Sequence, residues 1–227
     1  MRCVILACLV AAAAPVATQA APAPSPAVYV VAYADVLASA APRAATVLRE
    51  YRDASRGELG ALGIDVFSQR GRPSGFAIIE TWRDGPAFEA HDKAAAFLNL
   101  SRELKPMQLA PLDVRRHTVY SLGSAASGRQ NAVTLLVHVD VPPTFLADYE
   151  RLVTPYIEGT RGESGLLRLD ILQAIPPHTN HFTVIESWVD ARTLQAHQRA
   201  AFAQTYREEL APKLGALYDE RAYKKMN

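Results

Sequence analysis

The chain has 227 residues, of which 49% are hydrophobic and 21% are charged, and its formal net charge at pH 7 is +1. This length allows one large domain or two domains of roughly 100 residues each. The near-neutral charge lacks the basic excess of a nucleic-acid-binding protein, so we expect no nucleic-acid partner.

The first 27 residues differ in composition from the rest. After a positive start, residues 4–14 form an apolar run that Pro15 ends, and a small residue, Ala20, stands at the expected cleavage point. The run is too short to span a bilayer, and the pattern is typical of a secretory signal peptide. We therefore expect a signal peptide at 1–20, a loose leader at 21–27, and a periplasmic or secreted protein that has no membrane association after cleavage.

Both cysteines, Cys3 and Cys8, lie in this N-terminal segment. The mature protein is therefore expected to contain no disulfide, thiol nucleophile or thiolate metal site.

From residue 28 onward, short β-branched and aromatic runs alternate with helical patterns. The predicted elements are, in order, a strand at 28–34, a helix over 44–54, strands at 62–67 and 76–82, a helix from Asp84 to about Leu104, and a strand at 114–122. The same order returns as a strand at 132–141, a helix over 145–156, strands at 166–174 and 182–188, a helix from Asp190, and a strand at 217–223.

One motif shows that the second half repeats the first. Glu80-Thr-Trp82-Arg-Asp84, followed by His91, recurs 106 residues later as Glu186-Ser-Trp188-Val-Asp190, followed by His197. Further matches lie 105 residues apart, including Tyr51 with Tyr156 and the tripeptides at 56–58 and 161–163. We therefore predict two tandem domains, at 28–122 and 132–227, joined by a flexible linker at 123–131.

Each predicted unit reads strand, helix, strand, strand, helix, strand, which is the ferredoxin-like (βαββαβ) arrangement of the α+β class. Its two helices cover one face of the sheet, yet the opposite face is also apolar, with Ala77 and Ile79 in the first unit and Ile185 in the second. A sheet that is apolar on both faces needs a second partner. The natural partner is the sheet of the other unit, which predicts an intramolecular pseudo-dimer.

The Glu-x-Trp-x-Asp motif followed by Ala-His, between the third strand and the second helix, resembles the antibiotic biosynthesis monooxygenase (ABM) family. The resemblance covers residues 28–120 and 132–224, and it implies a dimeric α/β barrel, formed here within one chain. It also implies a space between sheet and helices that holds an aromatic substrate. Several members oxidise dihydroxy-aromatics with O₂ without metal or flavin, so the resemblance implies no cofactor and no metal.

The chain departs from two branches of that family. The haem-degrading branch has a tryptophan where this chain has His91 and His197, and its iron-binding histidine falls near Ser101 and Arg207 here, which argues against haem degradation. Quinol-oxidising members often carry a second histidine before the helix phenylalanine, where this chain has Ala96 or Ala201.

The candidate catalytic residues are His91 and His197, because an imidazole titrates near neutrality and suits a general base. A purely structural role stays open for both. The candidate substrate-binding residues are aromatic or imidazole side chains, namely Trp82, Trp188, Tyr33, His138, Phe97 and Phe202.

Asp84 and Asp190 are predicted helix caps. Glu80 and Glu186 share a face with apolar residues, so each is expected to pair with an arginine or a helix N-terminus. His178 and His181 have a ligand-like spacing, but they lie in the predicted hairpin turn and have no copy at residues 72–75, so we expect a polar turn rather than a metal site.

Two functions follow from these residues. The first is a secreted, cofactor-independent monooxygenase that acts on a quinol or another electron-rich aromatic with O₂. The alternative is a non-enzymatic protein of the same fold that binds a small aromatic ligand or haem. Pairing of two chains into a further homodimer is left open.

Overall fold

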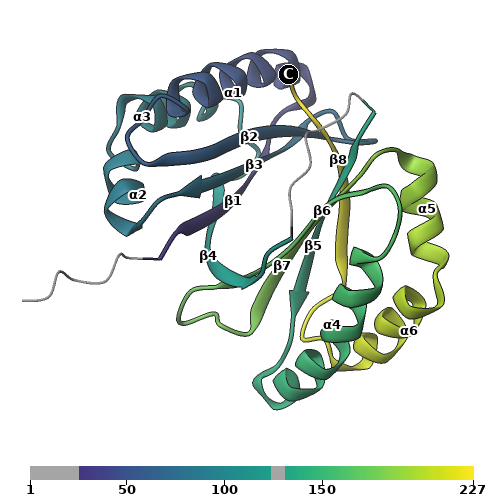
Figure 1. The fold of residues 1–227 in the computed structure, drawn as a ribbon. Coiled ribbons are helices and arrows are strands. Elements are labelled where there is room, and N and C mark those ends of the chain that lie inside the picture. The colour runs from purple at the N-terminus through teal and green to yellow at the C-terminus, as the bar shows by residue number, and fades with distance from the viewer. Residues whose placement is uncertain (1–25, 124–130) are drawn as a thin grey trace, which may run out of the picture.

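The computed structural model describes residues 26–123 and 131–227, which form two similar units (Figure 1). The first unit contains β1 (Val28–Asp35), α1 (Ala41–Ser55), β2 (Ala61–Gln69), β3 (Gly75–Trp82), α2 (Gly85–His91), α3 (Ala95–Leu104) and β4 (Asp113–Ser121). The second contains β5 (Val133–Asp140), α4 (Leu146–Arg161), β6 (Leu166–Ala174), β7 (His181–Trp188), α5 (Ala191–Arg199), α6 (Ala201–Leu210) and β8 (Asp219–Lys225). The predicted signal peptide, most of the leader and most of the linker lie outside the described residues.

The strands of both units close into one antiparallel barrel. Within the first unit the strand order is β4-β1-β3-β2, and within the second it is β8-β5-β7-β6. The last strand of each unit then pairs with the other unit, β8 with β2 and β4 with β6. The predicted α+β fold, two tandem ferredoxin-like units in an intramolecular dimeric α/β barrel, is confirmed.

The alternation of side chains along the strands divides the core into three parts. On β3, Phe76, Ile78 and Trp82 pack under the helices of the first unit, whereas Ala77 and Ile79 face the inside of the barrel. The second unit has its own helix-side core, and the barrel interior is a third cluster to which both units contribute. In Figure 1, the helices accordingly lie outside the barrel, next to their own unit's strands.

The C-terminus strengthens the connection between the units. After β8, the chain ends over α1 of the first unit, where C marks it in Figure 1. Arg52 donates a hydrogen bond to the Met226 carbonyl at 2.7 Å, and Arg49 donates to the Asn227 carbonyl at 3.0 Å. The Met226 side chain also packs into the helix-side core of the first unit.

The second helix of each unit, predicted as continuous, is broken in two. Ala94 separates α2 from α3 with an extended backbone (φ −74°, ψ 154°), and Ala200 separates α5 from α6 in the same way (φ −63°, ψ 136°). On one continuous helix, His91 and Phe97 would point about 120° apart, at about 100° per residue. The break lets both rings meet, with centroids 5.5 Å apart. Alanine favours helices, so the sequence carries no local signal for this break.

The two predicted helix caps are confirmed. The Asp84 carboxylate accepts a hydrogen bond from the Ala87 amide at 2.8 Å, and the Asp190 carboxylate accepts one from the Thr193 amide at 2.8 Å. Each cap satisfies a free amide in the first helical turn. The caps therefore fix the start of the helix that carries the candidate histidine. No helix in the described ranges is both long and apolar enough to cross a membrane.

Candidate functional site

In the first unit, the repeated motif forms a buried network between β3 and the helices. The Tyr51 hydroxyl donates to Glu80 Oε1 and lies 2.8 Å from His91 Nε2. Trp82 Nε1 donates to Glu80 Oε2 at 2.9 Å, and the indole stacks on the imidazole at 4.3 Å between centroids. Glu58 Oε2 lies 2.9 Å from His91 Nδ1. Both nitrogens of His91 therefore have partners, and the residue is only 1% exposed.

The second unit builds the same network from the equivalent residues. Tyr156 donates to Glu186 Oε1, and its hydroxyl lies 3.2 Å from His197 Nε2. Trp188 Nε1 donates to Glu186 Oε2 at 3.2 Å, and Glu163 Oε2 lies 2.6 Å from His197 Nδ1. The indole again stacks on the imidazole, at 4.7 Å. We call these two sets of five residues the helix-side networks.

The partners of Glu80 and Glu186 differ from the prediction. Neither carboxylate is bonded to an arginine or a helix N-terminus; each accepts from a tyrosine and a tryptophan and lies within 4 Å of the histidine. The physical reason is that a tyrosine on the buried face of α1 or α4 reaches the carboxylate from above the sheet. Burial raises the pKa of the Glu80 carboxyl. Burial, followed by the charge of Glu80, raises the pKa of the Tyr51 phenol.

Two proton arrangements satisfy the hydrogen bonds of the first network. In one, Glu80 is ionised, Tyr51 donates to it, and His91 donates to the tyrosine oxygen. In the other, Glu80 is protonated and donates to Tyr51, which donates to an unprotonated His91 Nε2. The two arrangements hold the same number of protons and differ only in where they lie along the line Glu80–Tyr51–His91. The network can therefore move a proton between a carboxylate and an imidazole without breaking a contact.

A half-buried phenylalanine covers each imidazole on the side of the helix break. Phe97 contacts His91 edge-on, and Phe202 lies 5.8 Å from His197 between centroids. The Phe202 ring lies directly against the backbone of α4, because a Cβ added at Gly159 would be 2.8 Å from it. These rings separate the histidines from the surface.

Tyr33 and His138 lie on the opposite side of the sheet, inside the barrel, and the two rings meet edge to face at 5.1 Å. The structure therefore brings together Trp82, His91 and Phe97 in one unit and Trp188, His197 and Phe202 in the other, but it separates Tyr33 and His138 from both.

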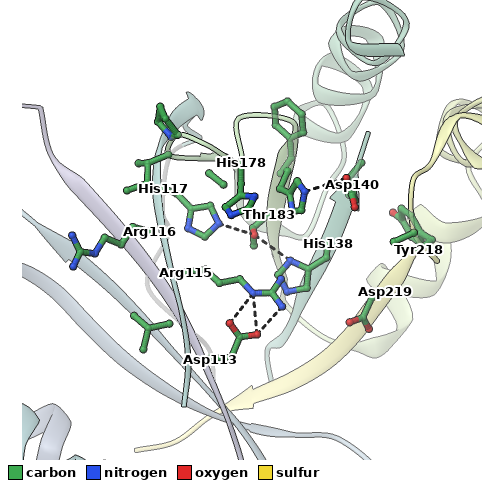
Figure 2. Close-up of a pocket in the computed structure, with 18 of the residues that line it drawn as sticks. Asp113, Arg115, Arg116, His117, His138, Asp140, His178, Thr183, Tyr218 and Asp219 are labelled. Atoms are coloured by element: carbon green, nitrogen blue, oxygen red, sulfur yellow. Dashed lines mark hydrogen bonds and ion pairs between the residues drawn. The ribbon is translucent and has the colours of Figure 1, made fainter. Parts of the chain in front are cut away.

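A pocket of about 1040 Å³ opens at the barrel end beside the β6–β7 hairpin (Figure 2). His138 and His117 lie on opposite sides of the Thr183 hydroxyl, which is 3.0 Å from His117 Nε2 and 3.3 Å from His138 Nδ1. Burial lowers the pKa of both imidazoles to about 4, so both rings are neutral at pH 7. His178 and His181, the predicted polar turn, line the same pocket.

Several residues of these sites were not identified from the sequence. Glu58 and Glu163 belong to a repeated Arg-Gly-Glu tripeptide, and the repetition was the signal that could have drawn attention to them. His117 and Thr183 carry no such signal, because the repeat places Tyr223 and Ala77 at the equivalent positions. Within the described part of the chain, no three side chains of His, Cys, Asp or Glu are grouped so as to hold a metal ion.

Comparison with known proteins agrees with this architecture. The sequence model described as antibiotic biosynthesis monooxygenase matches residues 27–103 and 132–209. A Bacillus subtilis (strain 168) protein named "Putative monooxygenase YcnE" is 36% identical over 62 residues, a match that spans 27% of this chain and 65% of that protein.

Two solved structures show the same fold across nearly the whole chain. A protein of Fusobacterium nucleatum subsp. nucleatum ATCC 25586, titled a putative monooxygenase, superposes with a TM-score of 0.78 at 16% identity, over 89% of this chain and 94% of its own. An anthrone oxidase-like protein superposes with a TM-score of 0.71 at 10% identity, over 88% of this chain and 92% of its own. At these identities the likeness concerns the fold alone. On the strength of the two sequence matches of the family model, the chain belongs to the antibiotic biosynthesis monooxygenase family.

Proposed function

We propose that the chain is a cofactor-independent monooxygenase that oxidises a quinol or a similar electron-rich aromatic with O₂ at its helix-side networks. The observation that carries this proposal is the second occurrence of the whole network, with a buried imidazole held between a carboxylate at Nδ1 and a phenol at Nε2. A carboxylate at Nδ1 fixes the orientation of the imidazole ring.

The reaction needs a base and a dry site more than it needs a cofactor. Loss of a phenolic proton leaves an electron-rich anion that can itself reduce O₂. One oxygen atom then enters the substrate, the other leaves as water, and a quinol that becomes a hydroxyquinone supplies all four electrons. The stoichiometry, one quinol and one O₂ giving one hydroxyquinone and one water, requires no external reductant.

In this proposal, the helix-side network receives the phenolic proton. The proton enters at His91 or His197, and a shift along the tyrosine to Glu80 or Glu186 can hold it away from the substrate. Glu58 and Glu163 provide the exit, because their side chains are 21% and 23% exposed whereas the histidines are buried. The substrate reaches the imidazole by displacing Phe97 or Phe202, the half-buried rings at the helix breaks.

O₂ consumption with a panel of quinols and anthrone-type phenols tests this proposal. We expect turnover by the wild-type chain, a partial loss in His91→Gln and in His197→Gln, and loss of activity in the double variant. Each single variant is the matched control for the other, since the units are equivalent. Turnover that persists in a folded double variant would exclude the networks as the site of proton transfer.

Ligand binding without turnover is the second candidate function. It is favoured by the observation that both nitrogens of His91 and of His197 already have partners, so a substrate could bond to either imidazole only by displacing one of them. In that case no quinol would support O₂ uptake, while at least one would raise the melting temperature of the protein.

We also propose that the protein acts outside the cytoplasm, on the basis of the apolar run at residues 4–14. N-terminal sequencing of the protein recovered from periplasm and medium tests this proposal. A mature chain that begins close after Ala20 is expected, and an intact Met1 in the cytoplasmic fraction would contradict it.

A further inference from the structure

The two halves of the barrel interior differ in size although their strands are equivalent. Strand pairing places Tyr33 opposite Ala77 and Asp113, and His138 opposite Thr183 and Asp219. Four interior positions are therefore equivalent in the two halves. With the residue of the first half given first, they are Tyr33 and His138, Phe67 and Leu172, Tyr223 and His117, and Ala77 and Thr183. Three large aromatic side chains of one half are thus replaced by two imidazoles and a leucine in the other.

The larger residues fill their half of the barrel. Phe67 and Tyr223 are buried, and Tyr33 packs under the guanidinium groups of Arg115 and Arg221, which lie 5.4 and 5.8 Å from its ring centroid. In the other half, the smaller residues leave the pocket of about 1040 Å³. The pocket is therefore a product of differences between the two units, and it occurs at the barrel end of the second unit.

The polar side of this pocket presents hydrogen-bonding groups of defined character. The Thr183 hydroxyl has one proton, so when it donates to one imidazole it accepts from the other. One of the two outer nitrogens, His117 Nδ1 or His138 Nε2, then carries a proton and the other carries a lone pair. Neither of these buried atoms has a hydrogen-bond partner within residues 26–123 and 131–227. A ligand hydroxyl or carbonyl group could satisfy them.

The ionic groups around the pocket are already paired. Arg115 contacts Asp113 through three hydrogen bonds of 2.7–3.1 Å, and Arg221 makes two bonds to Asp219. At the hairpin, His181 Nε2 lies 3.3 Å from the carboxylate of Asp140. A charged ligand would compete with these pairs, whereas an uncharged ligand leaves them intact.

Ring-bearing side chains dominate the remaining wall. Six ring-bearing residues line the pocket; Phe182 belongs to the helix-side core of the second unit and Tyr218 packs against that core, so the rings that face the barrel interior are those of His117, His138, His178 and His181. Aromatic faces and edges of this kind pack well against a planar ligand. The volume corresponds to the upper end of pockets that enclose a ligand of drug size.

We propose that this pocket is a ligand site, one per chain, for an uncharged aromatic molecule with a hydroxyl or carbonyl group, of the phenol or quinone class. The ring of the ligand packs among the imidazoles, and its oxygen bonds to one of the two outer nitrogens, His117 Nδ1 or His138 Nε2. The site lies inside the barrel, on the opposite side of the sheet from the helix-side networks, and it does not depend on the proposed oxidation.

Isothermal titration with 2-naphthol and with 1,4-naphthoquinone tests this assignment under anaerobic conditions, which prevent turnover. We expect the pocket to bind one probe molecule per chain, counted as the difference in stoichiometry between the wild-type chain and His138→Tyr, so that probe bound at the helix-side networks does not enter the count. His138→Tyr introduces the residue that the first unit has at the equivalent position and is expected to abolish binding in the pocket by filling it. Thr183→Val changes little volume but removes the bridging hydroxyl, and we expect about tenfold weaker binding.

The matched control is Thr134→Val, which makes the same change at a threonine of β5 that does not line the pocket and is expected to leave the affinity of the pocket unchanged. Circular dichroism verifies that each variant is folded. Loss of binding in Thr134→Val, unchanged affinity in both pocket variants, or no binding of either probe would each overturn the assignment. None of these results bears on O₂ uptake, so a failure here is distinct from a failure of the proposed function.

Discussion

The stability of the helix-side networks provides the most direct test of how these side chains interact. We consider Tyr51→Phe, which removes one hydroxyl and leaves the ring in place. That hydroxyl contacts Glu80 and His91 in a site where all three residues are buried. Its loss therefore leaves two buried polar atoms without their partner.

Each buried polar atom left without a hydrogen bond costs about 1–3 kcal/mol, and more when it is charged. For the two atoms together, we expect a loss of about 3 kcal/mol in the free energy of unfolding. A change of 1 kcal/mol shifts the melting temperature of a protein of this size by about 2–4 °C, so Tyr51→Phe should melt about 6–12 °C below wild type. Tyr156→Phe should have a similar effect, because Tyr156 makes the same two contacts in the second unit.

Thermal unfolding followed by circular dichroism, together with urea titration at constant m-value, measures this loss. Tyr33→Phe is the matched control, because the buried Tyr33 hydroxyl has no hydrogen-bond partner and its removal should change stability by less than about 0.5 kcal/mol. If Tyr51→Phe and Tyr33→Phe were equally stable, the hydrogen bonds of the network would not contribute to folding, and the argument for a tightly coupled site would be wrong.

Three further predictions follow from individual contacts. The pKa of His117 and of His138 is lowered from 6.5 to about 4 in the folded protein. Their contribution to stability is therefore complete above about pH 6.5 and is lost as the pH falls towards 4. Urea midpoints measured over this range should decline by the equivalent of about 2–3 kcal/mol per histidine, and in His138→Gln the decline should be smaller by the contribution of that histidine. Asp84→Ala should lower the urea midpoint through loss of the helix cap, and an unchanged midpoint would refute the capping role. Gly159→Ala should destabilise α4 despite the higher helix propensity of alanine, because its Cβ would meet the Phe202 ring at 2.8 Å, and a gain in melting temperature would show that the ring moves freely.

The fold was predictable because two independent patterns agree. On β3, alternation assigns Phe76, Ile78 and Trp82 to one face and Ala77 and Ile79 to the other, and both faces are apolar. The repeat then supplies a second sheet of the same kind to cover the free face. Burial of an apolar sheet on both sides leaves few arrangements, and the closed barrel is the one that forms.

The details of the networks could not be predicted from sequence pattern alone. Glu58 follows α1 and bonds to His91, which lies 33 residues further along the chain at the end of α2, three residues before the helix break. The break itself occurs at Ala94, a residue that favours helix continuation. The arrangement depends on tertiary packing, which overrides local preference, and neither Glu58 nor Ala94 has a local property that indicates it.

The pocket inside the barrel was missed for a different reason. A search guided by repetition finds what the two units share, whereas this pocket depends on positions where they differ, such as Tyr33 with His138 and Tyr223 with His117. The strand register that makes these positions equivalent is a property of the folded barrel. Once that register is known, the substitution of large rings by smaller ones identifies the pocket.

The contrast between the retained networks and the divergent barrel interior has a physical explanation. Within the first network, Tyr51, Glu80 and His91 each bond to two other side chains, so replacing one of them leaves buried polar atoms unpaired, and a partly satisfied network is less stable than an apolar core. In the barrel interior, the Tyr33 hydroxyl has no hydrogen-bond partner among the described residues, so this residue can change without disrupting a shared set of bonds. Divergence is therefore least costly in the barrel, and a duplicated chain of this kind is expected to acquire a new binding site there while both networks stay intact.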